Sequence, residues 1–253
     1  MGRAVTAETR PGERPRPSLA VAMYHRWRSL LFVHWAVDVD AVRPLLPPEL
    51  DVDTFDGKAW LGLVPFTMPY VRVRGLPRLP GTASFHETNV RTYVRHRGGE
   101  PGVWFFSLDA ASPLAVVGAR AASPLLYHRA AITCERRGDD VDYRLARAWP
   151  GPVPAAMEIR YTIDASANAS ARVAAPGSLE EFLVERYSLY AKRRGPLVRV
   201  RVLHRPYPLE SARVTHLNES LTRAAGIELA GRAPDSVLYS GGVDVEIFRP
   251  ELL

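Results

Sequence analysis

The chain has 253 residues, of which 47% are hydrophobic and 24% are charged, the balance of an ordinary globular protein of one or two domains. Its one cysteine, Cys134, cannot form an internal disulfide and lies in an apolar run, so we expect a structural residue in a reducing compartment. The apolar runs at residues 19–23 and 29–37 are too short for a signal peptide or a bilayer span. We therefore expect a cytoplasmic protein with no membrane partner.

The formal net charge of +6 raises the question of nucleic-acid binding, because Lys and Arg side chains that neutralise phosphates supply most of the non-specific affinity. The densest basic cluster, residues 192–194, ends a predicted helix, where positive charge suits the negative end of the helix dipole. Arginine dominates the basic residues, since Lys58 and Lys192 are the only lysines, a bias that we attribute to a GC-rich genome. We predict no nucleic-acid partner.

The N-terminal residues 1–22 are rich in Pro, Arg, Gly and Ala and have too little apolar content to offset their ordering entropy. We predict a disordered arm over this stretch and a single folded domain over residues 23–253.

The first half of this domain predicts strands joined by hairpins. The run LLFVHWAV at residues 30–37 is apolar without interruption, which is typical of a strand buried on both faces. A short helix over residues 40–46 ends at two prolines, and the turn Phe55-Asp56-Gly57-Lys58 leads into a returning strand at residues 59–70. Residues 71–81 predict a loop, and residues 87–97 and 103–109 a second hairpin that turns at Gly98 and Gly99.

The second half adds helices to further strands. We predict a helix over residues 114–122, a third hairpin from residues 130–136 and 141–149, and a strand over 157–163. Ser178 and Glu181 form a capping box before a helix over Leu179–Lys192. The remaining predictions are strands over 198–204 and 213–217, a helix over 219–225 and a pair of short strands within 237–248.

Taken together, these elements predict a mainly β member of the α+β class, with about nine or ten short strands and three to four peripheral helices. We expect a curled antiparallel sheet or a partly open barrel that encloses a cavity, without parallel βαβ units.

The segment FHETNVRTYVR carries the clearest polar pattern. Because side chains alternate along a strand, Glu87, Asn89, Arg91 and Tyr93 share one face. The hairpin partner, residues 103–106, is apolar on both faces and must be covered on both, so this row is expected to line a cavity rather than to face water. Glu87 and Arg91 are then predicted to form a charge-assisted pair, either as a structural ion pair or with Glu87 as a general acid or base.

In the strand VRVRVLH, Val198, Val200, Val202 and His204 share the apolar, inward face. His204 is therefore predicted to lie inside, at the tip of a strand that the following prolines end, either as a hydrogen-bonded core residue or as a ligand or base.

Motifs for common chemistries are missing from the sequence. It contains no G-x-S-x-G, H-E-x-x-H, G-x-x-x-x-G-K-[ST] or G-x-G-x-x-G pattern, and its seven histidines show no zinc-ligand spacing. We predict neither a metal nor a cofactor.

Several long blocks resemble the YqjF-like family of uncharacterised proteins: RWRSLLFVHWAVD, LLPPELDVDTFDGKAWLGLVPF, ETNVRTYVR, GVWFFSLDA, FLVERYSLYA and HRPYPLESA. The resemblance covers nearly the whole predicted domain. That family is similar to acetoacetate decarboxylase, which implies a curled β-sheet around a cavity.

The decarboxylase forms a Schiff base through a lysine that a second cation keeps nucleophilic. The corresponding stretch here is RAASPLLYH, and the resemblance implies that Tyr127 and His128 stand where the lysines would be. Neither Lys58 nor Lys192 lies in this stretch, which argues against Schiff-base chemistry. The resemblance also implies that Glu87 matches a cavity glutamate.

Three hypotheses follow for the function. The first is a protein that binds a small organic anion through Asn89, Arg91, Tyr93, Tyr127 and His128. The second is a lyase or hydrolase in which Glu87 or His204 moves a proton, and the third is a scaffold whose cavity is filled by its own side chains. The sequence leaves the oligomeric state open.

Overall fold

The computed structural model describes residues 14–77, 84–151, 154–164, 171–193 and 195–253. Most of these residues form strands, with four short α-helices and one short 3-10 helix among the described residues. The strands are β1 (Val21–Val37), β2 (Leu50–Val52), β3 (Ala59–Val73), β4 (Phe85–His96), β5 (Pro101–Ala110), β6 (Tyr127–Arg137), β7 (Asp140–Trp149), β8 (Ala156–Ile163), β9 (Ser188–Ala191), β10 (Val198–Leu203), β11 (Leu209–Glu219), β12 (Ser236–Phe248) and β13 (Glu251–Leu252). The helices are α1 (Val39–Val42), η1 (Arg43–Leu45), α2 (Pro113–Ala122), α3 (Leu179–Val184) and α4 (Leu221–Ala224).

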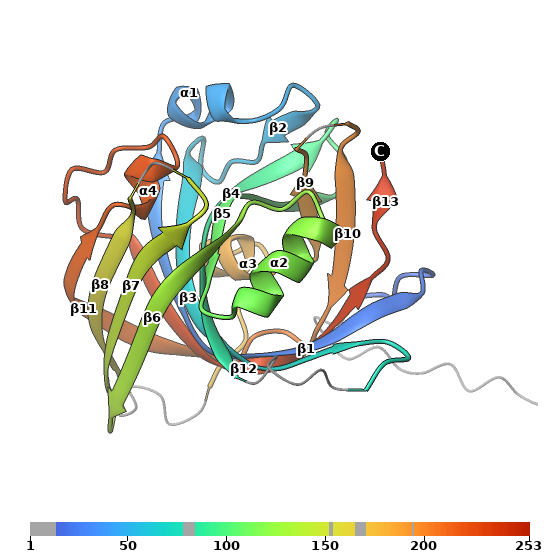
Figure 1. The fold of residues 1–253 in the computed structure, drawn as a ribbon. Helices are drawn as coiled ribbons and strands as arrows, with labels where there is room; N and C mark the ends of the chain where they lie inside the picture. The colour runs from blue at the N-terminus through green and yellow to red at the C-terminus, as the bar shows by residue number, and fades with distance from the viewer. Residues whose placement is uncertain (1–13, 78–83, 152–153, 165–170, 194) are drawn as a thin grey trace, which may run out of the picture.

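The strands close into two rings that share a wall. Hydrogen bonds run around the sequence β4, β5, β6, β7, β8, β11, β12, β1, β3 and back to β4, which closes a barrel. A second closure runs through β5, β9, β10, β12, β1, β3 and β4, and we call it the small ring. In Figure 1, β6, β7, β8 and β11 lie on one side of the shared wall and β9 and β10 on the other, with α2 and α3 between them.

Each ring has its own hydrophobic core, because the shared strands are buried on both faces. On β4, Val90 and Val94 pack into the core of the barrel, whereas Tyr93 packs into the core of the small ring with Phe32 and Trp60. Strands buried on both faces have nearly continuous apolar sequences, as the run at residues 30–37 does. The fold is therefore the mainly β, barrel-like architecture expected from the sequence.

The three predicted hairpins are present, as the antiparallel pairs β1–β3, β4–β5 and β6–β7. The β4–β5 turn places Arg97 and Gly98 at φ values of 49° and 70°, the left-handed conformations of a type I′ turn, which matches the twist of paired strands. The predicted helices at residues 40–46, 114–122 and 219–225 appear as α1 with η1, as α2 and as α4. The predicted loop at residues 71–81 begins later, because β3 continues to Val73.

The predicted helix over Leu179–Lys192 is wrong beyond its first turns. Ser178 caps α3 by accepting a hydrogen bond from the Glu181 amide at 3.2 Å, but the helix ends at Val184 and the chain becomes β9. The residues of β9 pair with β10 and, in parallel, with β5. Strand pairing therefore determines the conformation of residues 188–191, although the spacing of their apolar residues favours a helix.

Two further predictions about the strands are wrong. The pair of short strands expected within residues 237–248 is one long strand, β12, which stays continuous through a bend at Gly242, where φ is 123°. A Cβ atom there would lie 2.1 Å from the Trp27 carbonyl oxygen, so only glycine allows this approach. Parallel pairing also occurs, since α2 connects β5 to β6 in a β-α-β unit.

The predicted N-terminal arm lies mostly outside the described residues, which begin at Arg14. Residues 14–20 precede β1, which begins at Val21, two residues before the predicted start of the domain. None of the helices in the described ranges is both long and apolar enough to span a membrane.

Candidate functional site

The polar row on β4 lies inside the small ring. Glu87, Asn89, Arg91 and Tyr93 are 2%, 6%, 9% and 0% exposed, so none of them faces bulk water. The register neighbours of Glu87, Asn89 and Arg91 on β3 are Phe66, Val64 and Gly62, and cross-strand neighbours share a face of the sheet. The row is thus a polar stripe in an apolar interior.

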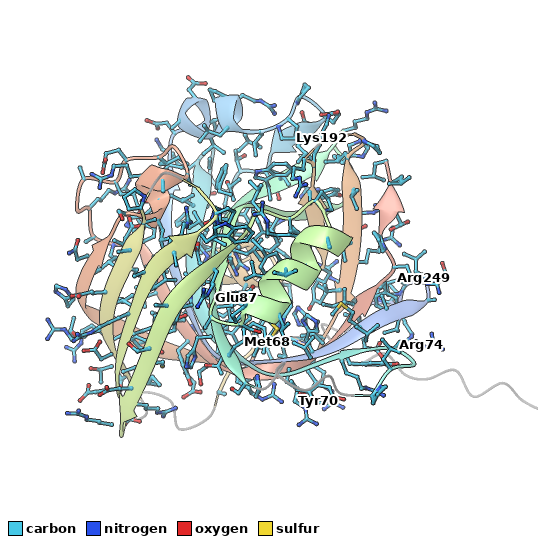
Figure 2. All side chains as sticks on the ribbon, in the orientation of Figure 1. Met68, Tyr70, Arg74, Glu87, Lys192 and Arg249 are labelled. Carbon is cyan, nitrogen blue, oxygen red and sulfur yellow. The ribbon has the colours of Figure 1, made fainter. Side chains whose placement is uncertain are left out.

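Glu87 lies at one end of this row. The hydroxyl of Tyr127 forms a hydrogen bond with its carboxyl group, and its Oε2 atom has no hydrogen-bond partner among the described residues. Burial and, to a smaller extent, the nearby Asp109 charge raise the pKa of Glu87 from 4.5 to about 8, although the Tyr127 hydrogen bond partly offsets them. Glu87 is therefore mainly protonated at neutral pH. Figure 2 shows it in the middle of the molecule beside α2.

Arg91 lies toward the other end and turns away from Glu87. Its guanidinium donates a 2.9 Å hydrogen bond to the Leu183 carbonyl of α3, and its Cζ atom lies 5.6 Å from the Phe32 ring centre and 5.7 Å from that of Tyr93. The predicted ion pair with Glu87 is wrong: in the described part of the chain the guanidinium of Arg91 donates to a backbone carbonyl and has no carboxylate partner, and its Nε atom has no hydrogen-bond partner. Each end of the row engages a different element, Tyr127 at the start of β6 and Leu183 in α3.

Tyr93 extends the Arg91 end into a hydrogen-bond chain. Its hydroxyl donates to the same Leu183 carbonyl at 2.7 Å and lies 2.7 Å from His34 Nε2. Since the hydroxyl has one proton to give, His34 Nε2 acts as the donor. Burial, together with the Arg91 charge, holds the pKa of His34 well below its usual value, so this imidazole is neutral. Gly62 makes room here, because a Cβ would come within 3.2 Å of both His34 and Arg91.

His204 also lies at the Arg91 end. It directly follows β10 and is 5% exposed. Its ring stacks against Tyr187 at a centroid distance of 4.6 Å and lies tilted against Tyr207 at 4.7 Å. Its Nδ1 donates to the Arg205 carbonyl at 2.7 Å, which leaves Nε2 as an acceptor without a partner among the described residues. Burial, helped by the Arg91 charge and partly opposed by the backbone hydrogen bond, lowers the pKa of His204 to about 4. His204 is therefore neutral at pH 7.

Tyr127 and His128 do not act together. They are consecutive residues of β6, so their side chains point to opposite faces. Tyr127 reaches Glu87, whereas His128 lies in register with Asp109 and its Nδ1 is 2.9 Å from the Pro150 carbonyl oxygen. On that other face, Asp109 forms a buried bidentate pair with Arg147 at 2.6 and 2.7 Å.

The sequence analysis missed the aromatic and imidazole groups that complete the interior. Trp27 lies 6.1 Å from both Phe66 and His204 between ring centres, and so connects the walls of the small ring. His34 could have been found, because it is the single polar residue in the buried run at residues 30–37 and shares a face with Phe32. Tyr187 and Tyr207 gave no comparable pattern.

Neither lysine reaches the polar row. Lys58 pairs with Asp38 at 2.8 Å in an exposed turn, and Lys192 pairs with Glu49. Figure 2 shows Lys192 at the edge of the molecule, well separated from Glu87. Within the ranges that the structure covers, no three His, Cys, Asp or Glu side chains gather as metal ligands.

Comparison with known proteins gives a family and a fold. Residues 24–244 match the model of the DUF2071 family, described as an uncharacterized conserved protein. The uncharacterized protein YqjF of Bacillus subtilis (strain 168) is 39% identical over 213 residues, which is 84% of this chain and 85% of YqjF.

Among solved structures, an acetoacetate decarboxylase-like enzyme from Sphingomonas wittichii RW1 superposes with a TM-score of 0.61 at 15% identity, covering 93% of this chain and 94% of that one. The enduracididine biosynthesis enzyme MppR, complexed with pyruvate, gives 0.59 at 15% identity and covers 93% of this chain and 91% of its own. These structures share the acetoacetate decarboxylase-like fold with this chain.

Proposed function

The chain belongs to the DUF2071 family, and we propose that it binds a small organic anion inside the small ring, at Arg91. The observation that carries this proposal is the burial of the Arg91 guanidinium without a carboxylate partner among the described residues. A buried charge is costly unless a counter-charge or hydrogen bonds compensate it. The Leu183 carbonyl supplies one hydrogen bond, and a bound anion supplies the missing counter-charge.

The other titratable groups around Arg91 do not supply that charge. Glu87 keeps its proton at neutral pH. Glu185 accepts hydrogen bonds from the Tyr207 amide and the Tyr187 hydroxyl instead of pairing with Arg91. Asp53 pairs with Arg186 at 2.6 Å. The interior of the small ring around Arg91 therefore favours a negatively charged ligand.

A carboxylate suits this position best, because the planar guanidinium can offer two parallel N–H groups to two oxygens. Asn89 contributes an amide whose Oδ1 has no partner among the described residues; this oxygen can accept a hydrogen bond from a donor on the ligand but not from its carboxylate. The complex of MppR with pyruvate supports the choice of a carboxylate, since pyruvate carries one. The positions of both lysines argue against a covalent imine in this chain.

The binding test uses thermal unfolding of the full-length protein with pyruvate, acetate and octanoate as probes. A ligand that binds only the folded state raises Tm with its concentration. We expect at least one carboxylate to raise Tm in the wild type but not in Arg91→Gln. The matched control is Arg249→Gln, the same change at an exposed position (Figure 2).

Equal Tm increases in both variants, or none with any carboxylate in the wild type, would contradict the proposal. The second of these results would favour a scaffold whose interior is filled by its own aromatic side chains.

A second candidate is a lysine-independent lyase or hydrolase, and the raised pKa of Glu87 favours it specifically. A carboxyl with a pKa of about 8 can both take up and release a proton near neutral pH. His204 is less suited to this role, because its pKa of about 4 makes it a weak base. Exchange of the pyruvate methyl protons in D₂O, followed by NMR, tests proton transfer next to a carbonyl. Exchange that persists in Glu87→Gln would exclude Glu87 as the base.

A further inference from the structure

We infer that the preferred ligand is an elongated carboxylate, with its anionic end at Arg91, an apolar middle, and an oxo or hydroxy group that reaches Glu87 at the far end. This inference rests on the proposed function and goes further, because it names the length and the chemical pattern of the ligand.

The separation of the two ends sets the length. Glu87 and Arg91 are four residues apart on one strand, and a strand rises about 3.3 Å per residue, so their Cα atoms are about 13 Å apart. Their polar groups do not converge. Arg91 reaches toward Leu183 and the ring of Tyr93, which is the next residue of the row away from Glu87, and Glu87 engages Tyr127 on β6. Pyruvate is too short to contact both ends.

The wall between the two ends is apolar. Next to Asn89, the register neighbours are Val64 on β3 and Leu108 on β5. Phe66 lies beside Glu87 and Phe105 beside Arg91, and all four of these neighbours belong to the core of the small ring. A ligand that follows this wall gains affinity from each methylene group of a hydrocarbon chain, or from an aromatic ring, that it buries there.

The far end calls for a hydrogen-bond acceptor. Glu87 Oε2 has no partner among the described residues, and the Tyr127 hydroxyl is engaged with the same carboxyl group. A protonated carboxyl has one O–H to donate, and a ketone oxygen or a hydroxyl oxygen can accept it. An ordinary fatty acid lacks such a group at this position.

The test compares three probes by isothermal titration calorimetry with the full-length protein at pH 7: pyruvate, octanoate and 7-oxooctanoate. Octanoate and 7-oxooctanoate have the same chain and differ in the far-end oxo group. We expect 7-oxooctanoate to bind about tenfold more tightly than octanoate, and pyruvate to bind at least about a hundredfold more weakly than octanoate. The oxo preference should disappear in Glu87→Leu and persist in Glu87→Gln, whose amide still donates.

A second measurement needs no variant. Because the pKa of Glu87 is about 8, raising the pH from 7 to 9 removes the donated proton, so the oxo preference of the wild-type protein should fall toward unity. A preference that stays constant over this range would overturn the role of Glu87. If pyruvate binds as tightly as 7-oxooctanoate and depends on Arg91, the elongated ligand is wrong and the proposed anion site stands. If no carboxylate binds, the proposed function itself is wrong.

Discussion

Replacing Glu87 by Gln should change how the stability of the protein depends on pH. The folded-state pKa of Glu87 is about 8 and its ordinary value is 4.5. Below pH 4.5 the carboxyl is protonated in both states. Between pH 4.5 and 8 only the unfolded chain releases the proton, so the wild-type free energy of unfolding falls by about 1.4 kcal/mol per pH unit. The total loss is roughly 5 kcal/mol by pH 8, and the curve is flat above that pH.

The glutamine variant keeps the shape of the side chain but cannot ionise, so this loss does not affect it. We expect Glu87→Gln to match the wild type within about 1 kcal/mol near pH 4.5 and to exceed it progressively up to pH 8. Buried His25 and His204, with pKa values of about 4, have the opposite effect, since stability rises with pH between 4 and 6.5. Their contribution is common to both proteins and cancels in the difference.

The assay is urea unfolding followed by tryptophan fluorescence at half-unit steps from pH 5 to pH 9. The matched control is Glu135→Gln, the same change on a side chain that is 69% exposed. Its free energy of unfolding should differ from that of the wild type by the same amount at every pH. If the difference in the free energy of unfolding between Glu87→Gln and the wild type is also independent of pH, the reasoning is refuted. Such a result would mean that Glu87 is ionised in the folded protein and that other groups stabilise its charge.

Three further variants test other parts of the site. Tyr127→Phe removes the hydrogen bond that lowers the pKa of Glu87. In this variant the free energy of unfolding should therefore keep falling to a higher pH than in the wild type before it becomes constant. Gly62→Ala places a Cβ 3.0 Å from an imidazole carbon and should destabilise by about 1 to 3 kcal/mol in urea unfolding, whereas Gly241→Ala, with nothing within 4 Å, should not. Asp53→Asn leaves the buried Arg186 guanidinium without its carboxylate and should cost about 3 to 5 kcal/mol by the same measurement.

The position of the polar row could be predicted from the sequence because only local information was needed. Strand alternation puts Glu87, Asn89, Arg91 and Tyr93 on one face, and the apolar partner strand requires that face to be buried. The direction of each side chain could not be predicted in this way. Glu87 turns to Tyr127 and Arg91 turns to the Leu183 carbonyl, and both partners come from elements distant in the sequence. The expected ion pair was wrong for this reason.

The helix prediction over Leu179–Lys192 was wrong because helix formation competes with strand pairing, and the partner strands are known only from the fold. The spacing of apolar residues fits a helix, but the stretch YSLYA also contains two tyrosines, a residue type enriched in strands. Three donors, from Arg91, Tyr93 and Arg186, take up the carbonyl groups of Phe182 and Leu183 at the end of α3. The chain then joins β5 and β10, so pairing in the sheet decides the outcome.

Tyr127 limits the chemistry that this interior can perform. The family resemblance placed this residue where the decarboxylase has a lysine, and the structure brings its hydroxyl to Glu87. Burial, with the Glu87 charge and hydrogen bond, raises the pKa of Tyr127 well above its ordinary value, so the phenol keeps its proton and is no nucleophile. A neutral phenol beside a protonated carboxyl can donate hydrogen bonds or relay a proton, but it cannot form an imine with a ketone. The Glu87 end is therefore suited to recognising a carbonyl group or to transferring a proton beside it, and the covalent route of the decarboxylase would need an amine that neither Lys58 nor Lys192 brings to this row.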